Sequence, residues 1–105
     1  MDCEQEFSER ELKYEMLEIE VEIKNRAGLH TRPAATIVKT AAKFKSDFFI
    51  YKDGFEINGK SIIGVMTLAA EQGSKLLLRF DGEDEQEASK EISELFEKGF
   101  DEPLV

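Results

Sequence analysis

The sequence has few of the residues that build disulfide frameworks, metal centres or membrane spans. It contains one cysteine, two prolines and no tryptophan in 105 residues. Cys3 has no second cysteine for an internal disulfide and no neighbouring His or Cys for a metal site. No apolar run approaches the roughly 18 residues that a membrane span needs, and the acidic start, MDCEQEF, differs from a signal peptide. We therefore expect one cytoplasmic domain with no disulfide, no metal, no cofactor and no membrane insertion.

Positive charge is also scarce, and its distribution is uneven. The net charge is −9, with −6 in residues 1–20, −8 in residues 81–105 and +5 in residues 21–80. Such a balance argues against a nucleic-acid binder, which needs positive charge opposite phosphate. The cationic middle suits phosphate or an acidic protein partner. The acidic ends are explained by solubility alone, or the N-terminal extension has an additional role in shielding that middle stretch from its partners.

Alternation of apolar and charged residues predicts four strands. Residues 17–24 alternate without a fault, which indicates a strand with one buried and one solvated face. Residues 48–51 and 55–57 flank Asp53-Gly54, a tight hairpin signal, and residues 75–80 form the fourth strand. Residues 25–30 are predicted to be a loop.

Three helices are predicted between and after these strands. Pro33 begins the first, because proline tolerates the first helical turn, and its apolar face is Ala34, Ile37, Val38 and Ala41. Ser61 is the expected N-cap of a short helix over 62–70. Asp84 and Glu87 form a capping-box pattern before a closing helix with apolar residues Ala88, Ile92, Leu95 and Phe96.

The element order β-α-β-β-α-β-α predicts an α+β fold. We expect an open-faced β-sandwich, in which a four-stranded antiparallel sheet is covered on one face by three helices. Residues 1–16 are an acidic N-terminal extension, expected to hold a short helix capped at Ser8 with Glu11 as its box partner. Residues 17–100 form the domain, and residues 101–105 are expected to be a frayed tail.

The strongest candidate for chemistry is His30, the only histidine in the chain. It lies between a glycine-containing loop and the helix that Pro33 begins, where unpaired backbone N–H groups favour an anion. Arg32 adds a permanent cation with a planar fork of donors for phosphate. A neutral imidazole there can attack a phosphoryl group, although a lone histidine is also compatible with a simple surface or capping residue. Without a Walker-type loop or a second base nearby, we expect a protein whose histidine receives a group that another protein brings.

Two motifs resemble the HPr family, the histidine phosphocarriers of the phosphoenolpyruvate-dependent phosphotransferase system (PTS). Residues 28–35, GLHTRPAA, resemble its active-site signature, and residues 58–69, NGKSIIGVMTLA, resemble its regulatory-serine segment. The resemblance implies an HPr-like domain and a carrier without independent turnover, not an enzyme. It implies that His30 carries phosphate on Nδ1, that Arg32 stabilises it, and that backbone donors of Thr31 and Arg32 cap it.

The same resemblance implies a second site and a set of partners. Ser61 would be phosphorylated by an ATP-dependent kinase of the HPr kinase/phosphorylase type, although a serine in this place is often only an N-cap. Partners would dock on Ile62, Ile63 and Met66, which the sequence alone also allows as a core stripe. The resemblance implies a monomer that accepts phosphate from enzyme I and passes it to an EIIA-type acceptor in sugar transport. A nitrogen-type regulatory carrier, or a module that only binds a transcription regulator or kinase, remains the alternative.

Overall fold

The alternating segment after Met16 forms the first edge of the sheet. The structure is a computed structural model, and it describes residues 16–105. The elements in chain order are β1 (Leu17–Glu22), α2 (Thr31–Ala41), β2 (Asp47–Lys52), β3 (Phe55–Asn58), α3 (Ile62–Thr67), β4 (Lys75–Asp81), α4 (Glu85–Glu97) and the short 3-10 helix η1 (Gly99–Asp101). The helix expected within residues 1–16 falls on residues outside this range.

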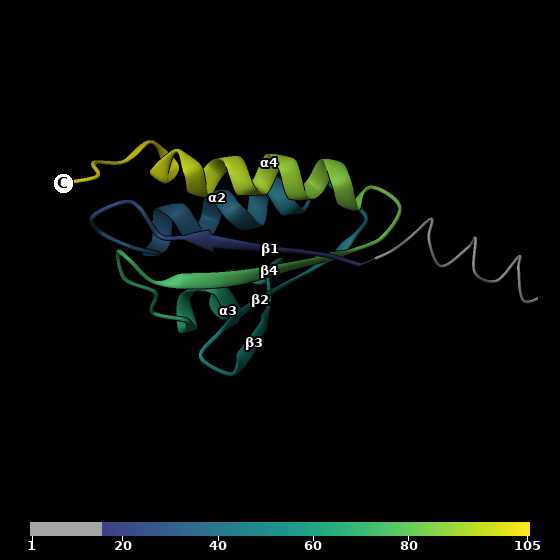
Figure 1. Ribbon diagram of the computed structural model, residues 1–105, viewed down its shortest axis with the longest axis horizontal. Coiled ribbons are helices and arrows are strands. Elements are labelled where there is room, and N and C mark those ends of the chain that lie inside the picture. Colours follow the sequence, from purple (N-terminus) through teal and green to yellow (C-terminus); the bar gives the residue numbers. More distant parts are fainter. Residues whose placement is uncertain (1–15) are drawn as a thin grey trace, which may run out of the picture.

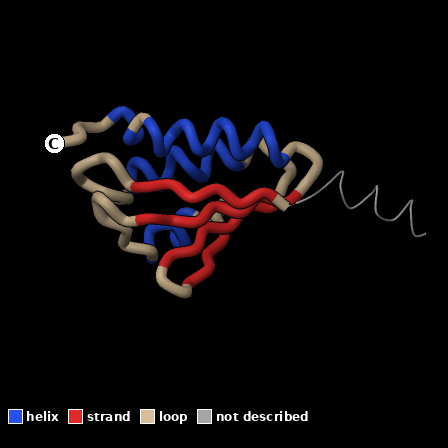
Figure 2. Tube along the Cα trace, in the orientation of Figure 1, coloured by secondary structure: helices blue, strands red, loops and turns tan. Residues whose placement is uncertain are grey.

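The four strands form one antiparallel sheet in the order β1-β4-β2-β3. Helix α4 packs on β1 and β4, α3 packs on β3, and α2 packs on both other helices. Figure 1 shows α2 and α4 together along β1 and β4, with α3 lower in the view beside β2, and Figure 2 shows the same arrangement by element type. The expected α+β open-faced sandwich is confirmed.

The core lies between the sheet and the helices, and the side chains that alternate along the strands supply it. Rings of Phe48 and Phe80 stack at 4.7 Å between neighbouring strands. Phe96 of α4 meets Phe100 edge to face at 5.0 Å, which fixes the chain just after α4. Other fully buried core residues come from β2, β4, α2, α3 and α4: Ile50, Leu76, Leu78, Ile37, Val65 and Ile92.

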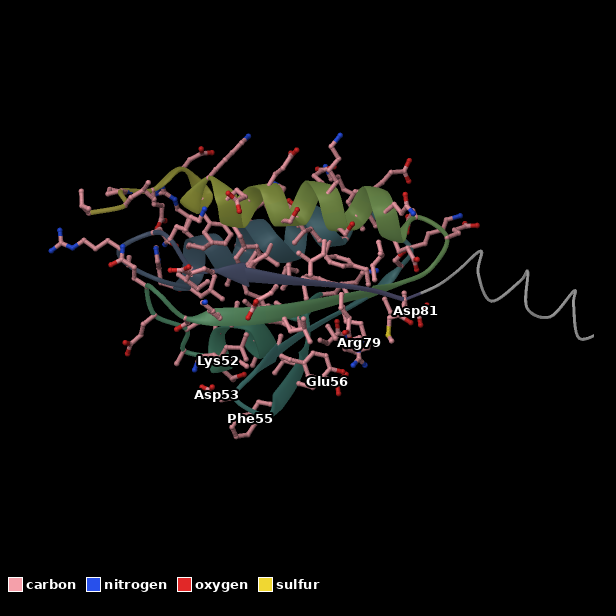
Figure 3. All side chains as sticks on the ribbon, in the orientation of Figure 1. Lys52, Asp53, Phe55, Glu56, Arg79 and Asp81 are labelled. Atoms are coloured by element: carbon pink, nitrogen blue, oxygen red, sulfur yellow. The ribbon has the colours of Figure 1, made fainter. Side chains whose placement is uncertain are left out.

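The opposite face of the sheet carries a mixed polar surface. Arg79 of β4 lies over the ring of Tyr51 at 4.5 Å, and its Nε donates to Glu18 of β1 at 3.1 Å. Glu56 of β3 lies on the same face, beside Tyr51 in the strand register (Figure 3). No helix of the described residues is long and apolar enough to cross a membrane.

Two helix boundaries differ from the predicted ones. Helix α2 begins at Thr31, so Pro33 is its third residue, still within the first turn where no backbone donor is required. Helix α3 ends at Thr67 instead of Ala70, because the chain turns into the left-handed region at Ala69 (φ 49°). The tight turn at Asp53-Gly54 is confirmed, with φ angles of 51° and 85° that match a type I′ hairpin.

The capping box at Asp84 is wrong, although Asp84 does precede α4. Its side chain makes no capping hydrogen bond. Its carboxylate instead accepts from the backbone N–H of Lys45 at 2.8 Å, from the backbone N–H of Ser46 at 2.9 Å and from the Ser46 hydroxyl. Glu85 accepts from the backbone N–H of Gly82 at 3.0 Å. Asp84 therefore fastens the α2–β2 loop to the start of α4.

Candidate functional site

His30 is the residue immediately before α2. Its backbone is extended (φ −92°, ψ −167°), as at a helix N-cap, but its side chain does not cap the helix. The backbone of the first turn is held by a bond from the Ala34 N–H to the His30 carbonyl at 3.0 Å. The imidazole is 44% exposed. A ring that is neither buried nor used as a cap is free to react with a group arriving from solvent.

Gly28 brings the His30 loop against the chain that follows α3. Its φ is +74°, and a Cβ at this position would lie 2.5 Å from the carbonyl oxygen of Ala70. The next residue, Leu29, is buried and donates its N–H to the same carbonyl at 2.9 Å. Only glycine suits both the left-handed backbone and this close approach. The loop backbone next to His30 is therefore held in a fixed position.

Arg32 and Thr31 lie in the first turn of α2, and both are exposed. The backbone N–H groups at the start of a helix have no intrahelical partners, so those of Thr31 and Arg32 are available to an anion. The Arg32 side chain is 75% exposed and its Nε lies 3.8 Å from a carboxylate oxygen of Glu102. A cation and two backbone donors thus lie in the helical turn next to His30.

The C-terminal segment also reaches this site, which corrects the expectation of a frayed tail over 101–105. Both carboxylate oxygens of Glu102 lie 3.0 Å from His30 Nε2. Pro103 accepts from the Arg26 N–H at 2.9 Å, and Leu104 accepts from the Gln72 side chain at 2.8 Å. Figure 1 shows the C-terminus and the β1–α2 loop at the same end of the fold. These hydrogen bonds hold the tail where a polar, proline-containing end would otherwise move freely.

The side chain of Glu102 is only 7% exposed, yet it stays ionised. The hydrogen bond from His30 holds the pKa of Glu102 below its ordinary value, helped by the Asn25 side chain and the charge of Arg32 and opposed by desolvation. Hydrogen bonds to the charged form of a carboxyl favour that form. At neutral pH, Glu102 is therefore an anionic acceptor in direct contact with the histidine.

Asn25 is the second residue of this site that the sequence pattern did not indicate. It is fully buried, and its Nδ2 donates to the Gly28 carbonyl at 2.8 Å and to Glu102 Oε1 at 2.9 Å. Both partners are acceptors, which fixes the amide with its nitrogen toward them. Its Oδ1 is buried without a partner among the described residues. Asn25 was predicted only as loop, and a buried polar residue in a loop has no periodic signature in the sequence.

Ser61 is the N-cap of α3, as predicted. Its hydroxyl accepts from the Gly64 N–H at 3.1 Å, and its carbonyl accepts from the Val65 N–H at 2.9 Å. Helices α2 and α3 pack together, but no hydrogen bond or ion pair joins Ser61 to His30 in residues 16–105. The two candidate sites are therefore on neighbouring elements, with no hydrogen bond or ion pair between His30 and Ser61 among the described residues.

The predicted docking residues of α3 lie on the surface. Ile62, Ile63 and Met66 are 38%, 73% and 41% exposed, whereas Val65 between them is completely buried. Helix α3 therefore fills the core through Val65 and leaves these three apolar side chains in solvent. The alternative of a core stripe is excluded for these three residues by their exposure.

Other features of the described chain do not form a competing site. Nowhere in residues 16–105 do three or more His, Cys, Asp or Glu side chains gather in a way that could hold a metal ion. A cavity of about 350 Å³ lies between the β2–β3 hairpin and the end of α3, near the labelled hairpin residues of Figure 3. Its lining contains no histidine, serine or cysteine, and consists of Lys52, Asp53, Phe55, Ile57, Thr67 and Leu68.

The arrangement around His30 is suited to accepting and releasing a phosphoryl group. A partly exposed imidazole can act as the nucleophile, and the first turn of α2 with Arg32 can bind the phosphate oxygens. The described site therefore has a nucleophile for the phosphoryl group and donors for its oxygens.

Comparison with known proteins agrees with this chemistry. A family model described as the PTS HPr component phosphorylation site matches residues 17–98. Phosphocarrier protein HPr of Xylella fastidiosa is 49% identical over 87 residues, covering 83% of this chain and 98% of that protein. The crystal structure of HPr from Thermoanaerobacter tengcongensis superposes with a TM-score of 0.80 at 46% identity, covering 84% and 99% of the two chains.

A second kind of relative is also similar. Crh of Bacillus subtilis, described as a catabolite repression protein whose crystal structure is a dimer with a swapped domain, superposes with a TM-score of 0.62. It is 42% identical, and the match covers 81% of this chain and 94% of that chain.

Proposed function

The chain belongs to the HPr family of PTS phosphocarrier proteins, and we propose that His30 is the residue on which it carries the phosphoryl group. In this proposal, phospho-enzyme I donates the group to His30, and His30 passes it to an EIIA-type acceptor. The family consists of phosphocarrier proteins, which are carriers and not enzymes.

The position of His30 is the observation that carries this proposal. It is a 44% exposed imidazole at the start of α2, with Arg32 in the same turn and a glycine-fixed loop behind it. It also lies within the segment that matches the family model. Arg32 binds the phosphate through its guanidinium, and the backbone N–H groups of Thr31 and Arg32 cap the phosphate oxygens.

Phosphorylation by phosphoenolpyruvate and enzyme I tests the proposal. The unmodified protein should acquire acid-labile phosphate, because a phosphoramidate bond hydrolyses in acid, and His30→Ala should acquire none while keeping its fold by circular dichroism. Ser61→Ala is the matched control, and it should accept the same label as the unmodified protein. Acid-labile phosphate on His30→Ala would overturn the assignment.

Ser61 is proposed as a second, regulatory site for an ATP-dependent kinase. Its hydroxyl already lies at a helix start next to the exposed Ile62 and Ile63. Phosphate there would add almost two negative charges beside the apolar docking surface, so docking of enzyme I should weaken without loss of the fold. Peptide mapping after kinase treatment should find phosphate on Ser61, and Ser61→Asp should bind enzyme I more weakly than Ser61→Ala. Phosphate on Ser46, on Ser74 or on a threonine would contradict this role.

The exposed residues Ile62, Ile63 and Met66 are proposed as the surface on which these partners dock. Their exposure supports this role, because the centre of a transient interface is apolar and these side chains are accessible to a partner in the free protein.

The proposed partners are enzyme I, EIIA-type domains, an HPr kinase/phosphorylase and a transcription regulator. The carrier is proposed to act as a monomer. Sedimentation at several protein concentrations tests the monomeric state. A dimer, as in the crystal structure of Crh, would contradict it.

A regulatory carrier is the second candidate function, and the similarity to Crh favours it. Such a protein, a nitrogen-type carrier or a binding module, signals through its phosphorylation state without moving sugar. Transfer from the phosphorylated protein to sugar-specific EIIA domains separates the two. Rapid loss of label to a sugar-specific domain supports transport, and retention of label with binding to a regulator supports the alternative.

A further inference from the structure

The contact between Glu102 and His30 fixes where the histidine proton lies. An ionised carboxylate has acceptor capacity only, so the ring nitrogen that it touches must donate. The nitrogen within 3.0 Å of both Glu102 oxygens is Nε2. A neutral His30 in this arrangement therefore carries its proton on Nε2 and its reactive lone pair on Nδ1.

The other ring nitrogen is left unoccupied. Nδ1 makes no hydrogen bond within the part of the chain that the structure describes, and the ring does not cap α2. Nε2, in contrast, is covered by a carboxylate whose own side chain is only 7% exposed. The two nitrogens thus differ in both protonation and access.

The carboxylate is held in place from two sides. Asn25, fully buried, donates to Glu102 Oε1 at 2.9 Å, and the same amide nitrogen donates to the Gly28 carbonyl at 2.8 Å. The residues after Glu102 are tied down through the Pro103 and Leu104 carbonyls. Because its partners are already in position, Glu102 needs no rearrangement to keep its contact with the ring.

We propose that Glu102, braced by Asn25, is a positioning residue that selects Nδ1 of His30 as the phosphoryl acceptor. It keeps the proton on Nε2 and covers that nitrogen, so only Nδ1 can attack phosphorus. This inference deepens the proposed function, because it rests on His30 being the phosphorylated residue. When the Nδ1–P bond forms, Nε2 keeps its proton and the ring becomes cationic. The Glu102 carboxylate then stabilises that charge in the way an acidic partner stabilises an imidazolium in hydrolase triads.

Chemical phosphorylation with phosphoramidate tests the selection without any protein partner. The Nδ1 lone pair attacks phosphorus, the P–N bond of phosphoramidate breaks, and its nitrogen, already carrying three protons, leaves as ammonia with the bonding pair. Nitrogen-15 NMR of the product then shows which ring nitrogen bears the phosphate. The unmodified protein should give the Nδ1 product. In Glu102→Ala the ratio of Nδ1 to Nε2 product should fall by about tenfold or more, the size expected for loss of one hydrogen bond to a charged group.

Two further variants complete the experiment. Glu102→Gln keeps the size of the side chain but removes the charge, and its amide can donate to Nε2, so it should also lose selectivity for Nδ1. Asp101→Asn removes the adjacent exposed carboxylate and should keep the unmodified ratio, which separates a specific contact from general charge. Circular dichroism and thermal unfolding identify any variant that fails to fold.

The outcomes separate this inference from the proposed function. An unchanged ratio in both folded Glu102 variants, or an Nε2 product from the unmodified protein, would overturn the role of Glu102. Failure of enzyme I and phosphoenolpyruvate to label the unmodified protein would instead overturn the proposed function, while the phosphoramidate ratio would still report on Glu102.

Discussion

The individual side chains around His30 have two different roles. Arg32 and the first turn of α2 provide positive charge and N–H donors for an incoming phosphate. Glu102 and Asn25 provide the acceptor and the support on the side of Nε2. Arg32 Nε also lies 3.8 Å from a Glu102 oxygen, so the cation and the anion both lie near the ring. The cation can bind an incoming anion, and the carboxylate can compensate positive charge that develops on the ring.

Replacement of Arg32 by lysine tests the cationic side. Lysine keeps the charge but loses the planar fork of donors, so transfer from phospho-enzyme I should slow without stopping. Single-turnover rates provide the measurement. Arg26→Lys is the matched control, because Arg26 is an exposed arginine of the loop that precedes α2, and it should transfer at the unmodified rate. An Arg32→Lys protein as fast as this control would show that the fork has no role.

The secondary-structure elements place these residues through contacts that join distant parts of the chain. Gly28 sets the β1–α2 loop against the residues after α3, and the segment after α4 returns across that loop. The edge-to-face contact of Phe96 with Phe100 directs the chain as it leaves α4. The site is therefore assembled from the start of α2 and the end of the domain, which are separated by most of the sequence.

This arrangement explains what could be read from the sequence and what could not. The strands, α2 and the Ser61 cap depend on neighbours a few positions away, and alternation, helical spacing and capping residues reveal such neighbours. Asp84 was assigned to a local capping box, whereas its partners, Lys45 and Ser46, are 39 and 38 positions away. Glu102 bonds to a residue 72 positions away. Only folding brings such pairs together, so no local pattern indicates them.

Replacement of Asp84 by asparagine should destabilise the fold at neutral pH by about 1–3 kcal/mol, because an amide cannot accept all three hydrogen bonds. The bond from the Ser46 hydroxyl, with the backbone bonds from Lys45 and Ser46, lowers the pKa of Asp84 below its usual 3.8. A carboxyl with a lowered pKa stabilises the fold above its unfolded pKa and loses that effect as the pH falls through its folded pKa.

The difference in unfolding free energy between Asp84→Asn and the unmodified protein should therefore be full at pH 7 and shrink below pH 3.8. Glu87→Ala is the control, because it removes the exposed acceptor side chain that the box pattern paired with Asp84. A larger loss in Glu87→Ala than in Asp84→Asn would restore the capping box. Urea titrations across this pH range make the comparison.

At the scale of the whole domain, the structure describes a four-stranded sheet and its helices within residues 16–105. Its core, its antiparallel sheet and its site all use residues of this range. We propose that residues 17–100 form the folding unit, that the ordered tail adds Glu102 to the site, and that residues 1–15 are an acidic extension. Residues 1–20 carry a net charge of −6, whereas residues 21–80 carry +5. The extension can therefore affect transfer through its charge even where it does not affect folding.

Deletion of residues 1–15 separates these two effects. The shortened protein should unfold within about 3 °C of the full chain, because it keeps every core residue that the structure describes. If the extension shields the cationic surface, the shortened protein should accept phosphate from enzyme I faster at low salt. This gain should shrink as salt is added, because the Debye screening length falls to roughly 10 Å at about 0.1 M salt. Equal rates at low salt would leave only the solubilising role.

The location of the phosphate in the unmodified protein is the most direct test. The full chain should be phosphorylated with phosphoenolpyruvate and enzyme I, digested at a pH that preserves acid-labile phosphate, and mapped by mass spectrometry. The phosphate should lie on His30. Phosphate on a serine or threonine would contradict the assignment of His30 as the carrier residue. So would the absence of phosphate on folded protein in a reaction that contains phosphoenolpyruvate and enzyme I.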